Sequence, residues 1–152
     1  MMTELKEKVL ATANFLTERN LHLATAESCT GGGLSYWLTS VPGSSAWFDR
    51  GFVTYSNDAK VAMLGIDAKQ LEINGAVSEE TALAMAKGAL LHSRADCAIA
   101  ITGIARRLED GVLEQGCYLV RRASGPALAG VRRFALSIFH YFAVHGFHLL
   151  QD

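Results

Sequence analysis

The chain places a serine, a threonine and a cysteine in one glycine-rich turn, Thr-Ala-Glu-Ser-Cys-Thr-Gly-Gly-Gly at 25–33. An apolar stretch at 21–24 precedes this turn, and a helix-like stretch at 34–38 follows it. Backbone N–H groups at a helix start have no partner within the helix, so they can bind an anion or an oxyanion. A nucleophile such as Ser28 and its oxyanion site could therefore share one loop. The ordinary alternative is that Ser28 or Thr30 only caps the helix.

A second segment, Gly-Phe-Val-Thr-Tyr-Ser-Asn-Asp-Ala-Lys at 51–60, supplies a tyrosine and a lysine. Tyr55 ends a strand-like stretch, and Lys60 lies about one turn into the helix that follows. Both side chains could face one cleft, where a lysine beside a serine can replace histidine as the catalytic base. The alternative is that Lys60 is a solvated helix lysine and that Tyr55 is an aromatic residue at the sheet end, with its hydroxyl in water.

The elements that must position these residues follow from hydrophobic periodicity and from turn residues. Strands that alternate with helices predict an α/β layered fold, with a mostly parallel sheet and an antiparallel part near the C-terminus. We expect helices at 3–19, 31–40, 57–64, from a Ser78 cap through 91, and at 137–150; we expect strands at 21–26, 51–55, 96–102, 116–120 and 127–136, the last two forming a hairpin.

Five segments occur in the order and spacing of the CinA C-terminal domain family: 25–32, 41–45, 51–60, 75–79 and 102–105. The chain resembles this family, and within it the stand-alone nicotinamide mononucleotide deamidases, from about residue 5 to residue 105. The resemblance implies a single domain over residues 1–152 with a three-layer α/β/α fold.

The activity that the resemblance implies is hydrolysis of nicotinamide mononucleotide to nicotinate mononucleotide and ammonia. Ser28 matches the family's nucleophile, Lys60 its base, and Tyr55 a tyrosine that relays a proton or orients the lysine. A free lysine has a pKa of about 10.4, so burial or a nearby positive charge has to lower it. The residues we assign to substrate binding are Glu27, Cys29, Thr30, Gly31, Gly32, Thr102 and Gly103.

Two of these assignments have alternatives, and the histidines near the C-terminus raise the separate question of a metal site. Cys29 is a rival nucleophile because thiolates are intrinsically more reactive, although the resemblance favours Ser28. Glu27 either orients the site or is a local structural charge at a strand end, and we lean toward the structural role. Histidines at 140, 145 and 148 could suggest a metal site, but a two-histidine helical face is more often packing or surface. We therefore expect neither a metal nor a cofactor.

The pattern departs from the family after Ala105. Family members continue with Gly-Pro and a glycine pair, whereas this chain has Arg-Arg-Leu-Glu-Asp-Gly-Val-Leu-Glu-Gln-Gly at 106–116. The family's C-terminal arginine aligns either with His145 or with Arg132, and both alignments stay open. The alternative function is accordingly a catalytically silent paralogue that binds a nucleotide or a protein partner. The apolar tail and the resemblance predict a homodimer.

Composition excludes several other classes of protein. The chain has 152 residues, of which 50% are hydrophobic and 19% charged, with a net charge of −1, so a disordered protein is excluded. Lysine and arginine form no dense block, so we expect no nucleic-acid partner. Three cysteines without a CxxC spacing argue against a disulfide framework. We find no signal core and no membrane span, and we expect a cytoplasmic protein acting on a small pyridine nucleotide.

Overall fold

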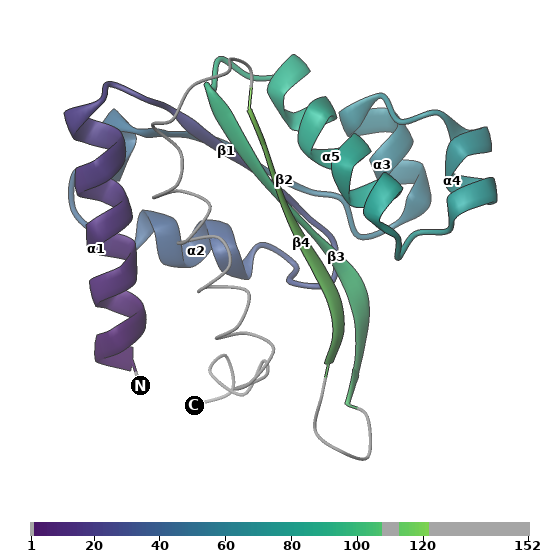
Figure 1. The fold of residues 1–152 in the computed structure, drawn as a ribbon, viewed down its shortest axis with the longest axis horizontal. Helices are drawn as coiled ribbons and strands as arrows, with labels where there is room; N and C mark the ends of the chain where they lie inside the picture. Colours follow the sequence, from purple (N-terminus) through teal and green to yellow (C-terminus); the bar gives the residue numbers. More distant parts are fainter. Residues whose placement is uncertain (1, 108–112, 122–152) are drawn as a thin grey trace.

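Residues 2–107 and 113–121 are described by the computed structural model of the chain. In the described residues, helices separate the first three strands, with three successive helices before the third strand, and a fourth strand directly follows the third (Figure 1). The elements are α1 (Met2–Glu18), β1 (Leu23–Glu27), α2 (Gly33–Thr39), the short 3₁₀ helix η1 (Ser44–Ala46), β2 (Phe48–Val53), α3 (Asn57–Leu64), α4 (Ala68–Asn74), α5 (Glu79–Leu91), β3 (Cys97–Arg107) and β4 (Leu113–Arg121).

The four strands form one sheet in the order β2-β1-β3-β4. β1 runs parallel to both β2 and β3, and β4 pairs with β3 in the antiparallel sense. Glu27, at the end of β1, is in register with Val53 of β2 and Ile101 of β3. The predicted mixed sheet is therefore confirmed, and the residues that follow β1 and β2 emerge at the same edge.

Helices cover both faces of this sheet. α1 and α2 lie on one side of it, and α3, α4 and α5 lie on the other (Figure 1). All five residues of β1 are buried, and successive side chains point to opposite faces. Leu23 joins the apolar cluster that includes α1 and α2, whereas Ala24 joins the cluster that includes α3, α4 and α5. The predicted three-layer α/β/α fold is confirmed.

Serine and aspartate caps define where the helices on the second face begin. The side chain of Ser56 accepts a hydrogen bond at the start of α3, Asp67 does so for α4, and Ser78 does so for α5. Gly65 ends α3 in the left-handed conformation, with φ of 67°. The sequence predicted the bounds of α3 and the Ser78 cap correctly, and it gave no prediction for α4.

The third strand is longer than the sequence predicted. β3 continues to Arg107, so Thr102 and Gly103 lie within the strand and do not form a turn that ends it. The two residues pair with Gly116 and Gln115 of β4, and this antiparallel pairing extends the strand beyond the end of β1. The hairpin consequently joins β3 to β4. The strand and helix predicted at 127–136 and 137–150 lie outside the described residues.

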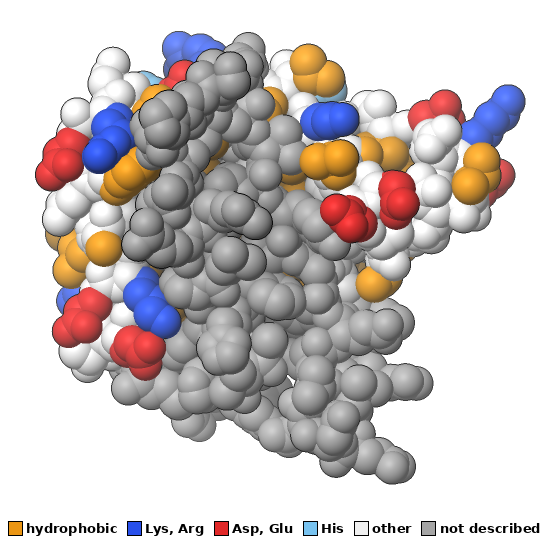
Figure 2. Space-filling model, in the orientation of Figure 1, with side chains coloured by type: hydrophobic (Ala, Val, Ile, Leu, Met, Phe, Trp, Pro, Cys, Tyr) orange, Lys and Arg blue, Asp and Glu red, His pale blue; other side chains and the backbone are white. Residues whose placement is uncertain are grey.

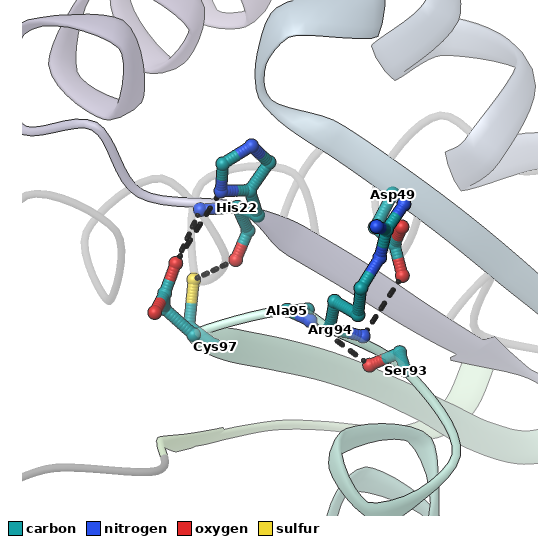
Figure 3. Close-up of polar contacts among 7 residues, drawn as sticks. His22, Asp49, Ser93, Arg94, Ala95 and Cys97 are labelled. Carbon is teal, nitrogen blue, oxygen red and sulfur yellow. Dashed lines mark hydrogen bonds and ion pairs between the residues drawn. The ribbon is translucent and has the colours of Figure 1, made fainter.

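Polar contacts fix the amino ends of the three parallel strands, at the edge opposite Ser28 (Figure 3). The N–H of His22, just before β1, donates to Asp96 Oδ2 over 2.8 Å, and Cys97 Sγ of β3 donates to the His22 carbonyl over 3.6 Å. Asp49 Oδ2 of β2 accepts from the N–H of Arg94 over 3.1 Å. These contacts hold the starts of the strands in register.

The described surface carries charges of both signs. On the face in Figure 2, positive and negative side chains of the described residues are interspersed, with hydrophobic side chains between them. Exposed hydrophobic residues of α4 and α5 include Ile73 and Leu91. Within residues 2–107 and 113–121, no helix combines the length and the apolar character that a membrane crossing requires.

Candidate active site

Ser28 is the first residue after β1 and is held by backbone hydrogen bonds on both sides. Its N–H donates to the Ile101 carbonyl over 2.9 Å, which extends the pairing of β1 with β3 by one residue. Its carbonyl accepts from the N–H of Gly31 over 3.0 Å, which closes a tight turn. Gly31 and Gly32 have φ of 57° and 98°, values that suit glycine, and α2 begins directly after them. The turn fixes the candidate nucleophile at the carboxyl edge of the sheet.

Lys60 reaches this serine from α3. Its Nζ donates to Ser28 Oγ over 3.1 Å, to the Thr54 carbonyl over 2.9 Å and to the Tyr55 carbonyl over 3.3 Å. Long helical side chains point toward the helix start, which brings Nζ back to the end of β2. The lysine is 1% exposed and Ser28 is 7% exposed. The structure therefore brings together the two residues that the sequence predicted as nucleophile and base.

Burial changes the protonation of this lysine. Loss of hydration lowers the pKa of Lys60, while a negative charge on the neighbouring Cys29 would act in the opposite direction. No carboxylate forms an ion pair with Lys60 among the described residues. A lowered pKa makes the neutral amine, which is the form able to take a proton, more accessible near neutral pH.

The rival nucleophile, Cys29, lies in a different environment. Its side chain is 8% exposed and belongs to the apolar cluster that includes Leu34 and Leu38. Burial raises the pKa of the Cys29 thiol to about 11, even though nearby backbone N–H groups oppose the shift. Because the thiolate is the reactive form, this geometry favours Ser28 over Cys29 at neutral pH.

Glu27 is fully buried and accepts hydrogen bonds at the start of α2. Its carboxylate accepts from the N–H of Leu34 over 2.9 Å, from the N–H of Ser35 over 2.8 Å and from Ser35 Oγ over 2.6 Å. The Glu27 carboxylate therefore binds two N–H groups at the start of α2. The sequence had suggested N–H groups at this helix start as an anion site. The position agrees with the structural role toward which the sequence analysis leaned.

The remaining turn residues differ in exposure. Thr30 is 2% exposed, and its hydroxyl has no hydrogen-bond partner within the described part of the chain. Gly31 is exposed, and a Cβ atom added there would meet open space. Gly32 is half-buried and lies against Val53, since an added Cβ atom would be 3.3 Å from Val53 Cγ2.

The side chains of the other predicted site residues make no hydrogen bond to Ser28 or Lys60 among the described contacts. Tyr55 contacts Lys60 through its backbone carbonyl, while its side chain is 70% exposed. The Thr102 hydroxyl donates to the Ala76 carbonyl over 2.7 Å and so ties β3 to the loop before α5. Gly103 is half-buried beside it. The described contacts therefore connect the hydroxyl of Thr102 to the scaffold and not to Ser28.

Thr54 was not predicted as part of the site, and it connects Lys60 to Glu27, the residue before Ser28. Its N–H donates to the Glu27 carbonyl over 2.7 Å, and its own carbonyl accepts from Lys60 Nζ over 2.9 Å. Thr54 acts through its backbone N–H and carbonyl, which almost every residue type has. The sequence therefore contains no signal for this role. Among the described residues, histidine, cysteine, aspartate and glutamate side chains form no group of three or more able to hold a metal ion.

Fold and site together define a three-layer α/β protein with a buried serine–lysine pair at the carboxyl edge of its sheet. The family model for the CinA C-terminal domain matches residues 3–110, which is more than half of the chain. The protein therefore belongs to the CinA C-terminal domain family.

Two curated relatives are similar to part of the chain. The nicotinamide-nucleotide amidohydrolase PncC of Escherichia coli K12 is 53% identical over 90 residues, which cover 59% of this chain and 54% of PncC. A CinA-like protein of Chlorobium limicola is 54% identical over 103 residues, which cover 68% of this chain and 23% of that protein. The match thus spans about half of PncC and about a quarter of the CinA-like protein.

Solved structures agree over nearly the whole chain. A CinA superfamily protein of Klebsiella pneumoniae superposes with a TM-score of 0.70 at 33% identity, covering 93% of this chain and 98% of that one. The competence/damage inducible protein CihA of Agrobacterium tumefaciens gives a TM-score of 0.68 at 36% identity, with coverage of 93% and 95%.

Proposed function

We propose that the chain is an amidohydrolase that converts nicotinamide mononucleotide to nicotinate mononucleotide and ammonia. The observation that carries this proposal is the buried contact of 3.1 Å between Lys60 Nζ and Ser28 Oγ. The family membership and the similarity to PncC support the choice of a nucleotide carboxamide as the substrate. Amide hydrolysis needs an activated nucleophile, stabilisation of an oxyanion and a proton for the leaving nitrogen.

The first half of the reaction uses neutral Lys60. It takes the proton from Ser28 Oγ as this oxygen forms a bond to the carboxamide carbon. The tetrahedral intermediate then breaks its C–N bond, and the ammonium of Lys60 returns the proton to the departing nitrogen, which leaves as ammonia. Ser28 remains acylated by the nicotinate group, and Lys60 is neutral again.

The second half repeats this proton transfer with water. Neutral Lys60 takes a proton from a water molecule as its oxygen attacks the ester carbon. The bond between that carbon and Ser28 Oγ breaks, the proton passes from Lys60 to Ser28, and nicotinate mononucleotide leaves. In this scheme Tyr55 relays a proton or orients Lys60, as the family resemblance implies.

The turn supplies the oxyanion site in this proposal. The N–H of Gly31 already donates to the Ser28 carbonyl over 3.0 Å, and that of Gly33 donates to the Thr30 carbonyl over 2.9 Å. The N–H of Thr30 lies toward the Cys29 thiol, so the N–H of Gly32 is the turn's donor for the developing negative charge in this proposal.

Ammonia release from nicotinamide mononucleotide by the purified protein tests the proposal, with nicotinate mononucleotide measured in the same samples by chromatography. Ser28→Ala should abolish both products, while Ser45→Ala, a change at an exposed serine of η1, should retain them. Nicotinamide and nicotinamide riboside, assayed beside the nucleotide, show whether the phosphate is required.

The absence of ammonia from a folded wild-type protein would overturn the enzymatic proposal. Calorimetric titration with nicotinamide mononucleotide then distinguishes the alternatives. Binding without turnover supports the catalytically silent paralogue, whereas turnover of a different amide supports an amidohydrolase of other specificity.

A further inference from the structure

We propose that Glu27 is the positioning residue of the serine–lysine pair, acting on Ser28 through its carboxylate and on Lys60 through its carbonyl. The inference rests on the serine–lysine chemistry proposed above. It assigns Glu27 no contact with substrate, because the side chain is fully buried and both of its oxygens already accept hydrogen bonds within the protein.

The carboxylate holds the nucleophile turn from its far end. Ser28 directly follows Glu27, and the turn closes where α2 begins, at the N–H groups of Leu34 and Ser35 that donate to Glu27 over 2.9 and 2.8 Å. The side chain therefore joins the residue before the nucleophile to the first turn of the helix after it. A charged acceptor at this place also matches the positive end of the helix dipole.

A second layer of contacts fixes the carboxylate itself. Ser35 Oγ donates to Glu27 Oε1 over 2.6 Å and lies 2.7 Å from Thr25 Oγ1, which belongs to β1. Gly51 of β2 faces these hydroxyls, since an added Cβ atom would clash with Ser35 Oγ and lie 2.8 Å from Thr25 Oγ1. Three elements thus restrict the position of one carboxylate.

The backbone of the same residue holds the base. The Glu27 carbonyl accepts from the N–H of Thr54 over 2.7 Å and lies 3.4 Å from Thr54 Oγ1. The Thr54 carbonyl in turn accepts from Lys60 Nζ over 2.9 Å. A displacement of Glu27 would therefore change the distance between Lys60 Nζ and Ser28 Oγ from both sides at once.

The test compares Glu27→Gln with Glu79→Gln, which removes an exposed carboxylate from the first turn of α5. Glutamine keeps the size of the side chain but places an NH₂ group against one of the N–H donors. The first readout is the rate at which a fluorophosphonate probe phosphonylates Ser28, measured by intact mass with Ser28→Ala as the blank. This reaction forms a phosphorus–oxygen bond with loss of fluoride, and it requires no nucleotide substrate. The second readout is kcat and KM for ammonia release, with circular dichroism to confirm folding.

We expect Glu27→Gln to slow phosphonylation and kcat by about tenfold or more, with KM changed by less than about threefold, and Glu79→Gln to match wild type. A KM raised tenfold with unchanged phosphonylation would identify Glu27 as a substrate ligand and overturn the inference, as would no change in either readout. If Glu27→Gln does not fold, Ser35→Ala decides: slower phosphonylation in a folded protein supports the inference, and an unchanged rate overturns it. If wild type releases no ammonia, the proposed function fails while the phosphonylation rates still test the positioning role.

Discussion

Among the described residues, Lys60 Nζ makes three hydrogen bonds, and only the one to Ser28 Oγ, over 3.1 Å, involves a group that can lose a proton. The other two acceptors are the carbonyls of Thr54 and Tyr55. When Lys60 is neutral, its two N–H bonds can satisfy the two carbonyls, which leaves the nitrogen lone pair facing the Ser28 hydroxyl. The backbone before α3 thus orients the base, and no charged side chain in the described part of the chain pairs with it.

The first prediction concerns the pH dependence of kcat/KM for ammonia release. Only neutral Lys60 can accept the Ser28 proton, so activity should rise with pH and level off above the pKa of Lys60. Since burial lowers that pKa, the inflection should lie below the ordinary lysine value of about 10.4. A profile measured from pH 6 to pH 10 checks this. An activity that falls as pH rises across this range would contradict a lysine base.

The second prediction concerns replacement of the base. Lys60→Arg keeps a positive charge that cannot be lost at neutral pH, and Lys60→Met removes the amine while filling a similar space. Both variants should lose at least about 100-fold in kcat. The exposed Lys69→Met variant is the control and should keep wild-type rates. Retained activity in Lys60→Arg with a folded protein would show that deprotonation of this side chain is not required.

The third prediction concerns Cys29. Because the thiol is buried and its pKa is raised to about 11, iodoacetamide at pH 8 should modify Cys29 only slowly in the folded protein, and Cys29→Ala should retain activity. Peptide mapping after timed alkylation, with unfolded protein as the reference, measures the rate. Rapid modification accompanied by loss of ammonia release would instead favour a thiolate nucleophile.

The third prediction extends to alkaline stability, which depends on the same raised pKa of Cys29. As pH rises above the ordinary thiol value of about 8.5, the unfolded chain releases the Cys29 proton before the folded chain does. The stabilising contribution of Cys29 is therefore complete below that pH and is lost as pH rises toward about 11. Urea midpoints at pH 8 and pH 10 should show a larger loss of stability in wild type than in Cys29→Ala.

The shared edge of Ser28 and Lys60 could be predicted from the sequence pattern, whereas the resemblance to the family decided between their catalytic and structural roles. A strand, a glycine-rich turn and a helix start placed Ser28, and the uninterrupted stretch at 57–64 placed Lys60 on a helix. Parallel pairing then brings both to the carboxyl edge. The prediction placed the end of β2 at Tyr55, two residues beyond Val53, where the structure ends it.

The parts that could not be predicted depend on tertiary pairing or on the main chain. The third strand was predicted to end at residue 102, but pairing with β4 continues it to Arg107. The Thr54 carbonyl is an acceptor that any residue would supply, so sequence gives no sign of it. Glu27 was placed among the substrate-binding residues with a structural role preferred, and only the geometry shows that its oxygens face α2.

The fourth prediction concerns the hydroxyl of Thr30, which is buried without a partner among the described residues. A buried hydroxyl that makes no hydrogen bond costs about 1–3 kcal/mol, so Thr30→Val should leave stability unchanged or raise it. Urea denaturation of both proteins measures this. A loss of more than about 1 kcal/mol in Thr30→Val would show that the hydroxyl is paired in solution, because its removal would then break a bond.

The fifth prediction concerns the space beside Gly51. A Cβ atom there would clash with Ser35 Oγ, so Gly51→Ala should destabilise the fold by about 1–3 kcal/mol. Ser35→Ala removes the clashing oxygen, although it also removes a hydrogen bond to Glu27. The cost of Gly51→Ala should therefore fall by about 1 kcal/mol when Ser35→Ala is already present, with Thr25 Oγ1 still limiting full recovery. Urea midpoints for the wild type, the two single variants and the double variant complete this cycle. An equal cost of Gly51→Ala with and without the Ser35 hydroxyl would place the clash elsewhere and remove Gly51 from the contacts that restrict the Glu27 carboxylate.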